Sequence, residues 1–436
     1  MGELWLVPVY SPLHDPRRVR EVVSGVLAKV SGLPGYTVRL WEPPETSGEG
    51  DALFLVVTGG TERRLLAMVE ERGGPAILLA HPGQNSLPAA LEAVARLRAE
   101  GHYAHVVYLG EEGSAALEEL ERWLRVVAVH RWMHSAHLGL VGAPSEWLVA
   151  SSPAPALVTC MWGPKVVLIE MEEFLARLDE VDPGEVGLVR EDFLARATRV
   201  REDSRAGTAG AREVSTEDVD RATGREVSAE DVRRAAAVYV ALRRLVDDYR
   251  LDALTVRCFD LLGPAGTTGC LALSRLNDEG VVAGCEGDLP ATVTMMLLSR
   301  LSGEPVFMGN PVRIDRGRET VWLAHCTVAR RLVTSYALRS HFESGVGVAV
   351  AGELRNGPVT IARIGGPELD DLLAEAGTLV ATGHEADLCR TQAVVRCPAA
   401  VSSLLDWPLG NHHVLAYGDL VREMYALCNM ACVSSR

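Results

Sequence analysis

The sequence predicts an α/β protein in which two parallel-sheet domains precede a β-rich domain built as an antiparallel sheet or small barrel. Three observations lead to this fold class. The chain has 436 residues and a mass of 47.0 kDa, which is long for a single hydrophobic core. Short apolar runs alternate with amphipathic helical patterns over the first 300 residues, a pattern typical of parallel sheets covered on both faces. After about residue 309 the pattern changes to strand runs separated by glycine turns.

The first predicted domain covers residues 1–136. One helix is expected from Asp15 to Ser31 and another from about Leu87. The apolar runs between the helices are LWLVPVY, YTVRLW, ALFLVVTGG, PAILLAHPGQNS and HVVYLG. Ligands of such sheets collect at the carboxyl ends of the strands. The polar residues that follow these strand ends, which also suit turn formation and helix capping, are Thr58, His81, Asn85 and Ser86.

The second predicted domain covers residues 137–308, with a charged insert at about 199–235. Its first strand runs into a glycine turn in LGLVGAPSEWLVAS, which lacks the full glycine fingerprint and the lysine of a phosphate-binding loop. The insert contains a near-duplicate, REVSTEDVDRA followed by REVSAEDVRRA. Each copy pairs a capping serine with an aspartate three residues later, Asp218 or Asp231. A duplicated helix start explains the repeat, and a partner-binding arm is the functional alternative.

The stretch AGCEGDLPATV places two carboxylates after the apolar strand GVVAGC and before a helix that begins near Pro290. Asp288 suits the helix N-terminus, where free N–H groups and the helix dipole favour a carboxylate. Glu286 has no such role. A carboxylate at a strand end in an α/β sheet fits either a ligand site or a structural hydrogen bond.

The third predicted domain, residues 309–436, holds five of the twelve histidines. They are His325, His341, His384 and the adjacent pair His412 and His413. Adjacent residues in a strand point to opposite faces, so only one of the pair can face a given site. Several histidines together with Glu286 indicate a mixed oxygen and nitrogen site for a divalent ion. Cys285 and Cys326 lack zinc-site spacing, so thiolate ligands are not expected.

Composition limits the class of partner and the location. The formal charge of −15 and the lack of a basic stripe argue against nucleic-acid binding. No segment reaches the roughly 18 to 20 uncharged apolar residues of a membrane span. The N-terminus lacks a signal-peptide pattern, so a cytoplasmic protein with reduced cysteines is expected.

A family resemblance rests on a run of motifs from about Leu251 to Asp419. These are GCLALSRLNDEGVVAGCEGDLPATVTMMLLSRLSGEPVFMGNP, AHCT, HFESG, CRTQ and GNHH. They resemble the L-fucose isomerase and L-arabinose isomerase superfamily, especially its compact members. The resemblance implies two Rossmann-like domains before a β-rich domain. It also implies a divalent metal, usually Mn²⁺, between the second and third domains, and a homo-oligomer, trimer or hexamer.

The resemblance also assigns roles to residues. Glu286 would be a metal ligand and acid/base residue, His413 a ligand with His412 as second choice, and His325 a further ligand. Asn310 stands where the family has an acid. An amide oxygen can bind a metal but cannot accept the proton that enediol chemistry moves. Either Glu286 is the only base, or another acid substitutes, with Glu343 preferred over Asp288 and Asp315, or the reaction differs from the family's usual one.

The predicted function is therefore a metal-dependent aldose–ketose isomerase acting on an open-chain sugar, deoxy sugars included, through an enediol. The alternatives are a metal-dependent hydrolase or lyase on a sugar derivative, and a non-catalytic sugar-binding protein. Arg390 and Gln392 of LCRTQ fit hydrogen bonds to sugar hydroxyls or closure of a β-turn. If a neighbouring subunit supplies substrate contacts, the resemblance makes His81 and Asn85 of the first domain the candidates.

Overall fold

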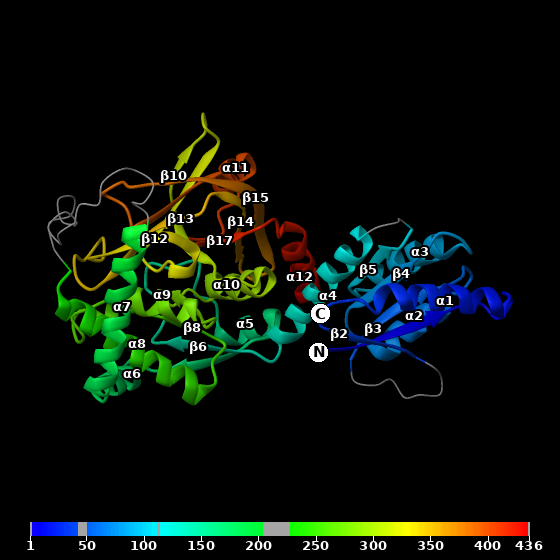
Figure 1. The fold of residues 1–436 in the computed structure, drawn as a ribbon, viewed down its shortest axis with the longest axis horizontal. Helices are drawn as coiled ribbons and strands as arrows, with labels where there is room; N and C mark the ends of the chain where they lie inside the picture. The colour runs from blue at the N-terminus through cyan, green and yellow to red at the C-terminus, as the bar shows by residue number, and fades with distance from the viewer. Residues whose placement is uncertain (1, 42–49, 111–113, 204–226, 435–436) are drawn as a thin grey trace. The chain divides into compact units, whose positions relative to one another are not determined.

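The computed structural model describes residues 2–41, 50–110, 114–203 and 227–434 (Figure 1). The chain forms two compact units, Met1–His130 with Asn429–Arg436, and Arg131–Cys428. The second sheet and the β-rich part share the second unit, and the domain boundaries predicted near residues 136 and 308 stay a prediction. Within the described residues, no helix combines the length and the apolar character that crossing a membrane requires.

The first unit is built on a five-stranded parallel sheet of order β2-β1-β3-β4-β5. Its strands are β1 (Gly2–Val9), β2 (Tyr36–Leu40), β3 (Asp51–Val56), β4 (Ala76–Ala80) and β5 (Ala104–Tyr108). Its helices are α1 (Pro16–Val30), α2 (Glu62–Arg72), α3 (Ser86–Ala99) and α4 (Ala115–Met133), the last of which continues into the second unit.

Helix α1 illustrates how the sequence sets these elements. Asp15 caps it by accepting a hydrogen bond from the Arg17 backbone N–H at 2.8 Å, and Pro16 occupies its first turn. Apolar residues spaced three or four apart form its buried face: Val19, Val23, Val26 and Val30. The predicted helix from Asp15 to Ser31 is confirmed, with both residues as its caps.

The second unit begins with a four-stranded parallel sheet of order β7-β6-β8-β9. The strands are β6 (His137–Val141), β7 (Lys165–Ile169), β8 (Ala253–Val256) and β9 (Val282–Cys285). The helices are α5 (Pro155–Trp162), α6 (Met171–Asp179), α7 (Pro183–Asp203), α8 (Ala229–Tyr249), α9 (Cys270–Asp278) and α10 (Leu289–Ser302), with the 3₁₀ turn η2 (Cys258–Leu261). Ser228 and Asp231 form the expected capping box of α8; the first copy of the duplicated segment lies outside the described residues.

A closed antiparallel barrel follows, of order β10-β11-β16-β15-β14-β17. Its strands are β10 (Phe307–Asp315), β11 (Thr320–His325), β14 (Gly357–Gly365), β15 (Asp371–Thr382), β16 (Thr391–Arg396) and β17 (His413–Tyr417). Beside it are the hairpin of β12 (Val333–Arg339) and β13 (Ala349–Leu354), the turn η3 (Arg330–Leu332), and helices α11 (Pro398–Asp406) and α12 (Val421–Ser434). The predicted fold class, parallel α/β sheets followed by a β-rich barrel, is confirmed.

Helix α10 joins the second sheet to the barrel. It packs against β9 on one side and against β14 and β17 on the other, and nearly all of its residues are buried. The Thr294 hydroxyl accepts a hydrogen bond from the Ile364 backbone N–H of β14 at 3.1 Å. This packing brings the carboxyl end of β9 next to the start of β17.

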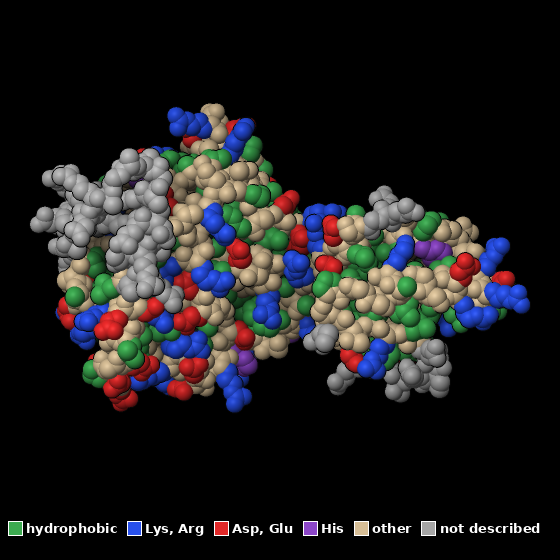
Figure 2. All heavy atoms as spheres, in the orientation of Figure 1, with side chains coloured by type: hydrophobic (Ala, Val, Ile, Leu, Met, Phe, Trp, Pro, Cys, Tyr) green, Lys and Arg blue, Asp and Glu red, His purple; other side chains and the backbone are tan. Residues whose placement is uncertain are grey.

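The described surface has mixed charge on the face drawn in Figure 2. Acidic and basic side chains are interspersed there over both units. The net charge of −15 is therefore not gathered into one acidic patch on that face.

Candidate metal centre

Glu286 follows directly after β9 on a backbone turn of unusual conformation. Its φ is +64° and that of Gly287 is +73°, a region that costs a residue with a β-carbon about 1 to 2 kcal/mol. A β-carbon on Gly287 would lie 2.7 Å from the Ala143 carbonyl oxygen, so only glycine fits there. The Glu286 carbonyl accepts a hydrogen bond from the Ser145 N–H at 2.8 Å. Strain of this kind is typical of functional sites, where it aims a side chain.

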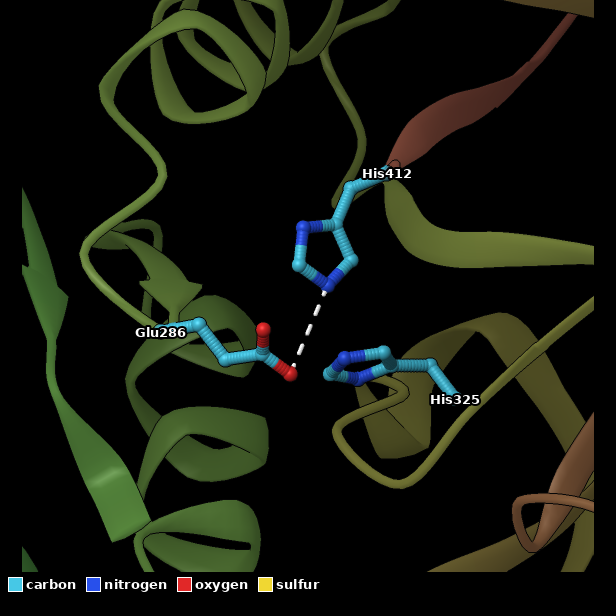
Figure 3. Close-up of side chains that lie close together, drawn as sticks. All are labelled: Glu286, His325 and His412. Atoms are coloured by element: carbon cyan, nitrogen blue, oxygen red, sulfur yellow. Dashed lines mark ion pairs between the residues drawn. The ribbon is translucent and has the colours of Figure 1, made fainter. Parts of the chain in front are cut away.

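Three buried side chains meet at this turn: Glu286, His325 and His412 (Figure 3). They come from the end of β9, the end of β11 and the residue before β17. Their ligand atoms all lie within 4.8 Å of one another, and Glu286 Oε1 is 3.6 Å from His412 Nε2. The imidazole rings are nearly perpendicular, with centroids 5.4 Å apart. One carboxylate and two imidazoles form a donor set that suits a divalent transition ion.

Asp288 fixes the orientation of His412. Its Oδ2 lies 2.9 Å from His412 Nδ1, which leaves the buried Nε2 facing Glu286 without a hydrogen-bond partner. Carboxylates commonly hold metal-binding histidines in this way, because the bond fixes the tautomer and ring orientation. The orphaned Nε2 is therefore consistent with a ligand atom.

Asp288 itself is held by a buried framework. Its carboxylate accepts the Ala291 N–H at the start of α10 at 2.9 Å and pairs with Arg363 Nη1 at 3.1 Å, with Asp288 and Arg363 both fully buried. Burial would raise the pKa of Asp288, but the charge of Arg363 and the His412 hydrogen bond lower it to about 2. Both carboxylate oxygens of Asp288 have partners, and the group is ionised at neutral pH. Asp288 is therefore unsuited to the acid/base role considered for it.

Arg363 extends this framework to two further segments. It donates to the Ser151 hydroxyl at 2.6 Å and to the Leu409 carbonyl at 3.2 Å. The polar groups behind the cluster are thereby satisfied by one buried arginine.

The two histidines differ in protonation. Burial and the charge of His412 lower the pKa of His325 to about 4, and its Nδ1 lies 2.8 Å from the Thr327 hydroxyl. Burial would lower the pKa of His412, but the hydrogen bond to Asp288 and the nearby Glu286 carboxylate raise it to about 9. Burial would likewise raise the pKa of Glu286, yet His412 and Trp147 lower it. Without a cation, a proton on His412 balances the two carboxylates; a divalent ion can replace it.

The structure groups His412 with the cluster, whereas the family resemblance favoured His413. His413 is the first residue of β17, pairs with Gly309 of β10 and lies outside the group. Burial and the charge of Arg363 lower the pKa of His413 to about 3. The two neighbours point to different sides, and the one preceding the strand reaches Glu286.

The remaining predicted metal and acid/base residues have different surroundings. Asn310 pairs with Ala324, the residue before His325, and its side-chain oxygen is buried without a hydrogen-bond partner. Glu343 is exposed on the turn at 342–344, next to His341. Asp315 ends β10 and accepts the Arg318 N–H at 2.9 Å, which agrees with a turn acid.

The predicted substrate residues divide between the units. His81 and Asn85 belong to the first unit: both ring nitrogens of His81 lie near backbone carbonyls, those of Val57 and Pro82, and Asn85 is exposed with a φ of +54°. The side-chain amide of Gln392 accepts a hydrogen bond from the Glu385 N–H and donates one to the Glu385 carbonyl, so both of its polar atoms already have partners. Arg390 is buried and donates from Nε to the Ser340 carbonyl at 2.8 Å.

Sequence reasoning missed Trp147 and Arg363. Trp147 donates from Nε1 to Glu286 Oε2 at 2.6 Å. It lies in the loop after β6, so the strand-end rule that selected Glu286 could have found it. Turns occupy the segment that contains Trp147, and α5 begins at Pro155. Arg363 stands alone in the apolar strand PVTIARIGG, which is a signal for a buried ion pair.

Comparison with known proteins gives relatives of one kind. No family model matches the chain. A sulfoquinovose isomerase of Alkalicoccus urumqiensis is 23% identical over 349 residues, covering 78% of this chain and 73% of the relative. One of Clostridium sp. (strain MSTE9) is 24% identical over 377 residues, covering 79% and 74%. One of Priestia megaterium is 27% identical over 200 residues, covering 43% and 44%.

These relatives agree with the motif resemblance. The two longer matches span most of both chains, so the similarity is not confined to the CEGD segment. The chain is similar to sulfoquinovose isomerases over most of its length, and it is an isomerase of the intramolecular oxidoreductase class.

Proposed function

We propose that this protein is a divalent-metal-dependent aldose–ketose isomerase whose active site is the cluster of Glu286, His325 and His412. The observation that carries the proposal is the buried cluster itself, with Asp288 behind His412. Its support is chemical: two imidazoles and a carboxylate converge on one point, and each histidine has its other nitrogen occupied by a protein oxygen.

Glu286, His325 and His412 would hold the ion, with the orphaned Asn310 oxygen as a fourth ligand. A bound divalent ion would polarise the sugar carbonyl and hold the neighbouring oxygen. Mn²⁺ is the ion that the family resemblance implies, and a mixed carboxylate and imidazole set is compatible with it.

Glu286 is our candidate for moving the proton between the two carbons. Its strained turn and the Trp147 hydrogen bond fix the carboxylate at the cluster, so little reorganisation is needed when a substrate arrives. Glu343 remains our candidate for the second acid/base group, because it is exposed and lies on the turn beside His341.

We take sulfoquinovose as the first substrate to test, because the relatives are named for it. Cytoplasmic location and a homo-oligomeric state remain proposals as well.

The test is proton exchange at the carbon next to the carbonyl. Metal-stripped protein is incubated in D₂O with sulfoquinovose, with and without Mn²⁺, and deuterium incorporation is followed by NMR. Exchange that requires Mn²⁺ and is lost in Glu286→Gln is expected. Glu353→Gln, at a half-buried glutamate of β13, is the matched control and should exchange like the wild type. Metal binding without exchange for any sugar would favour a hydrolase, a lyase or a binding protein instead.

A further inference from the structure

Three arginine side chains are buried among the described residues: Arg330, Arg363 and Arg390. Arg363 is paired with Asp288 at 3.1 Å, and Arg330 with Asp278 at 2.8 Å. Arg390 is only 8% exposed, yet within the described chain it makes no ion pair. A buried charge normally requires a partner, because leaving water without one is costly. Arg390 is therefore the exception to be explained.

The surroundings of Arg390 fix the side chain, and no carboxylate of the described residues pairs with it. Its Nε donates to the Ser340 carbonyl at 2.8 Å, and its guanidinium lies over the Phe342 ring at 5.6 Å from the centroid. The two terminal amino groups have no acceptor among the described residues. Burial and the nearby positive charge of Arg339 lower the pKa of Arg390. This arrangement leaves one edge of the guanidinium fork available to an anion.

Arg390 lies at the same end of the barrel as the metal centre. It directly precedes Thr391, which pairs with His325 in the register of β11 and β16. Ser340, whose carbonyl accepts the Arg390 hydrogen bond, directly precedes His341. The His341 ring packs on Phe259, and Phe259 packs on Trp147. Trp147 in turn donates to Glu286. A series of contacts between neighbouring side chains thus connects the segment that holds Arg390 to Glu286.

We propose that Arg390 binds an anionic tetrahedral group, a sulfonate, at the end of the open-chain sugar remote from the carbonyl. This inference rests on the proposed function, because it places the reacting carbons of the same sugar at the Glu286 cluster. A hydroxyl contact, the role first expected for Arg390, would leave its charge uncompensated. A sulfonate supplies the charge and two oxygens for the two amino groups. Arg390 would then decide which sugars the site accepts.

The test compares two sugars that differ in one group. Sulfoquinovose carries a sulfonate on its sixth carbon, and 6-deoxyglucose carries hydrogen there. The Arg390→Gln substitution removes one partner of the proposed buried charge pair. It is expected to lower kcat/KM for sulfoquinovose about 100-fold, mostly by raising KM, and to change kcat/KM for 6-deoxyglucose less than about threefold. Arg390→Lys should recover part of the loss. Arg396→Gln is the matched control at the far end of β16, the strand that follows Arg390, where the arginine is exposed and paired with Glu319 at 3.1 Å.

A second readout does not depend on turnover. Calorimetry with methanesulfonate on metal-stripped protein should show binding to the wild type and to Arg396→Gln, and none to Arg390→Gln.

The thermal unfolding midpoint separates a ligand-binding role from a structural one. Removing an unpaired buried charge should leave the midpoint unchanged or raise it, whereas Arg330→Gln, which breaks the pair with Asp278, should lower it.

The outcomes separate this inference from the proposed function. Equal losses for both sugars, or methanesulfonate binding that survives Arg390→Gln, would overturn the anion subsite and leave the isomerase standing. Arg390-dependent methanesulfonate binding without exchange of either sugar by the wild type would support the subsite and contradict the isomerase.

Discussion

Replacing Asp288 with asparagine tests the buried framework behind His412. The substitution keeps the shape and the helix cap, since asparagine caps as well as aspartate. It removes the charge that faces Arg363 at 3.1 Å and His412 at 2.9 Å. Breaking a buried ion pair on one side costs about 3 to 5 kcal/mol. We expect the free energy of unfolding to fall by that amount, measured by urea denaturation with linear extrapolation.

Two controls isolate the charge from the cap. Ser228→Ala removes the capping-box hydroxyl of α8 and should cost about 1 kcal/mol. The double variant Asp288→Asn with Arg363→Met removes both charges and should recover part of the loss. Because Asp288 also orients His412, Asp288→Asn should weaken Mn²⁺ binding about 10- to 100-fold. A loss of stability below about 1 kcal/mol with unchanged Mn²⁺ affinity would refute the framework.

Three further predictions concern single side chains of the site. His412→Gln should abolish Mn²⁺ binding, whereas His413→Gln should retain it. The electron paramagnetic resonance signal of free Mn²⁺ measures the binding. The reverse result would make His413 the ligand. Trp147→Phe keeps the ring contact with Phe259 but removes the hydrogen bond to Glu286. It should lower kcat about tenfold and leave the unfolding midpoint unchanged. An unchanged kcat would show that Trp147 is not part of the site. Gly287→Ala places a β-carbon 2.7 Å from the Ala143 oxygen at a φ of +73°, so it should destabilise by at least about 2 kcal/mol, and a neutral effect in denaturation would mean that the turn is not as described.

Local signals in the sequence located the elements that carry the site. Asp288 is predicted to lie at a helix N-terminus because a helical pattern begins near Pro290, and it caps α10 in the structure. Glu286 was singled out because it ends an apolar strand, and it does follow β9. These inferences depend on neighbours in the chain, which explains why they succeeded.

Interactions between distant segments were beyond such reasoning. The choice between His412 and His413 turned on the residue at which β17 begins, and a shift of one residue exchanges the two faces of a strand. The pairing of Arg363 with Asp288 joins residues 75 apart, and that of Trp147 with Glu286 joins residues 139 apart. No periodicity or capping signal connects such pairs; they follow from the packing of α10 between sheet and barrel.

Anomalous diffraction from crystals soaked in MnCl₂, recorded at the manganese absorption edge, tests the central claim most directly. One peak should appear per chain, bounded by Glu286, His325 Nε2 and His412 Nε2. It should be absent from His412→Gln crystals treated in the same way. A wild-type map with no peak at this cluster, or with its strongest peak at other side chains, would contradict the assignment of Glu286, His325 and His412 as the metal centre.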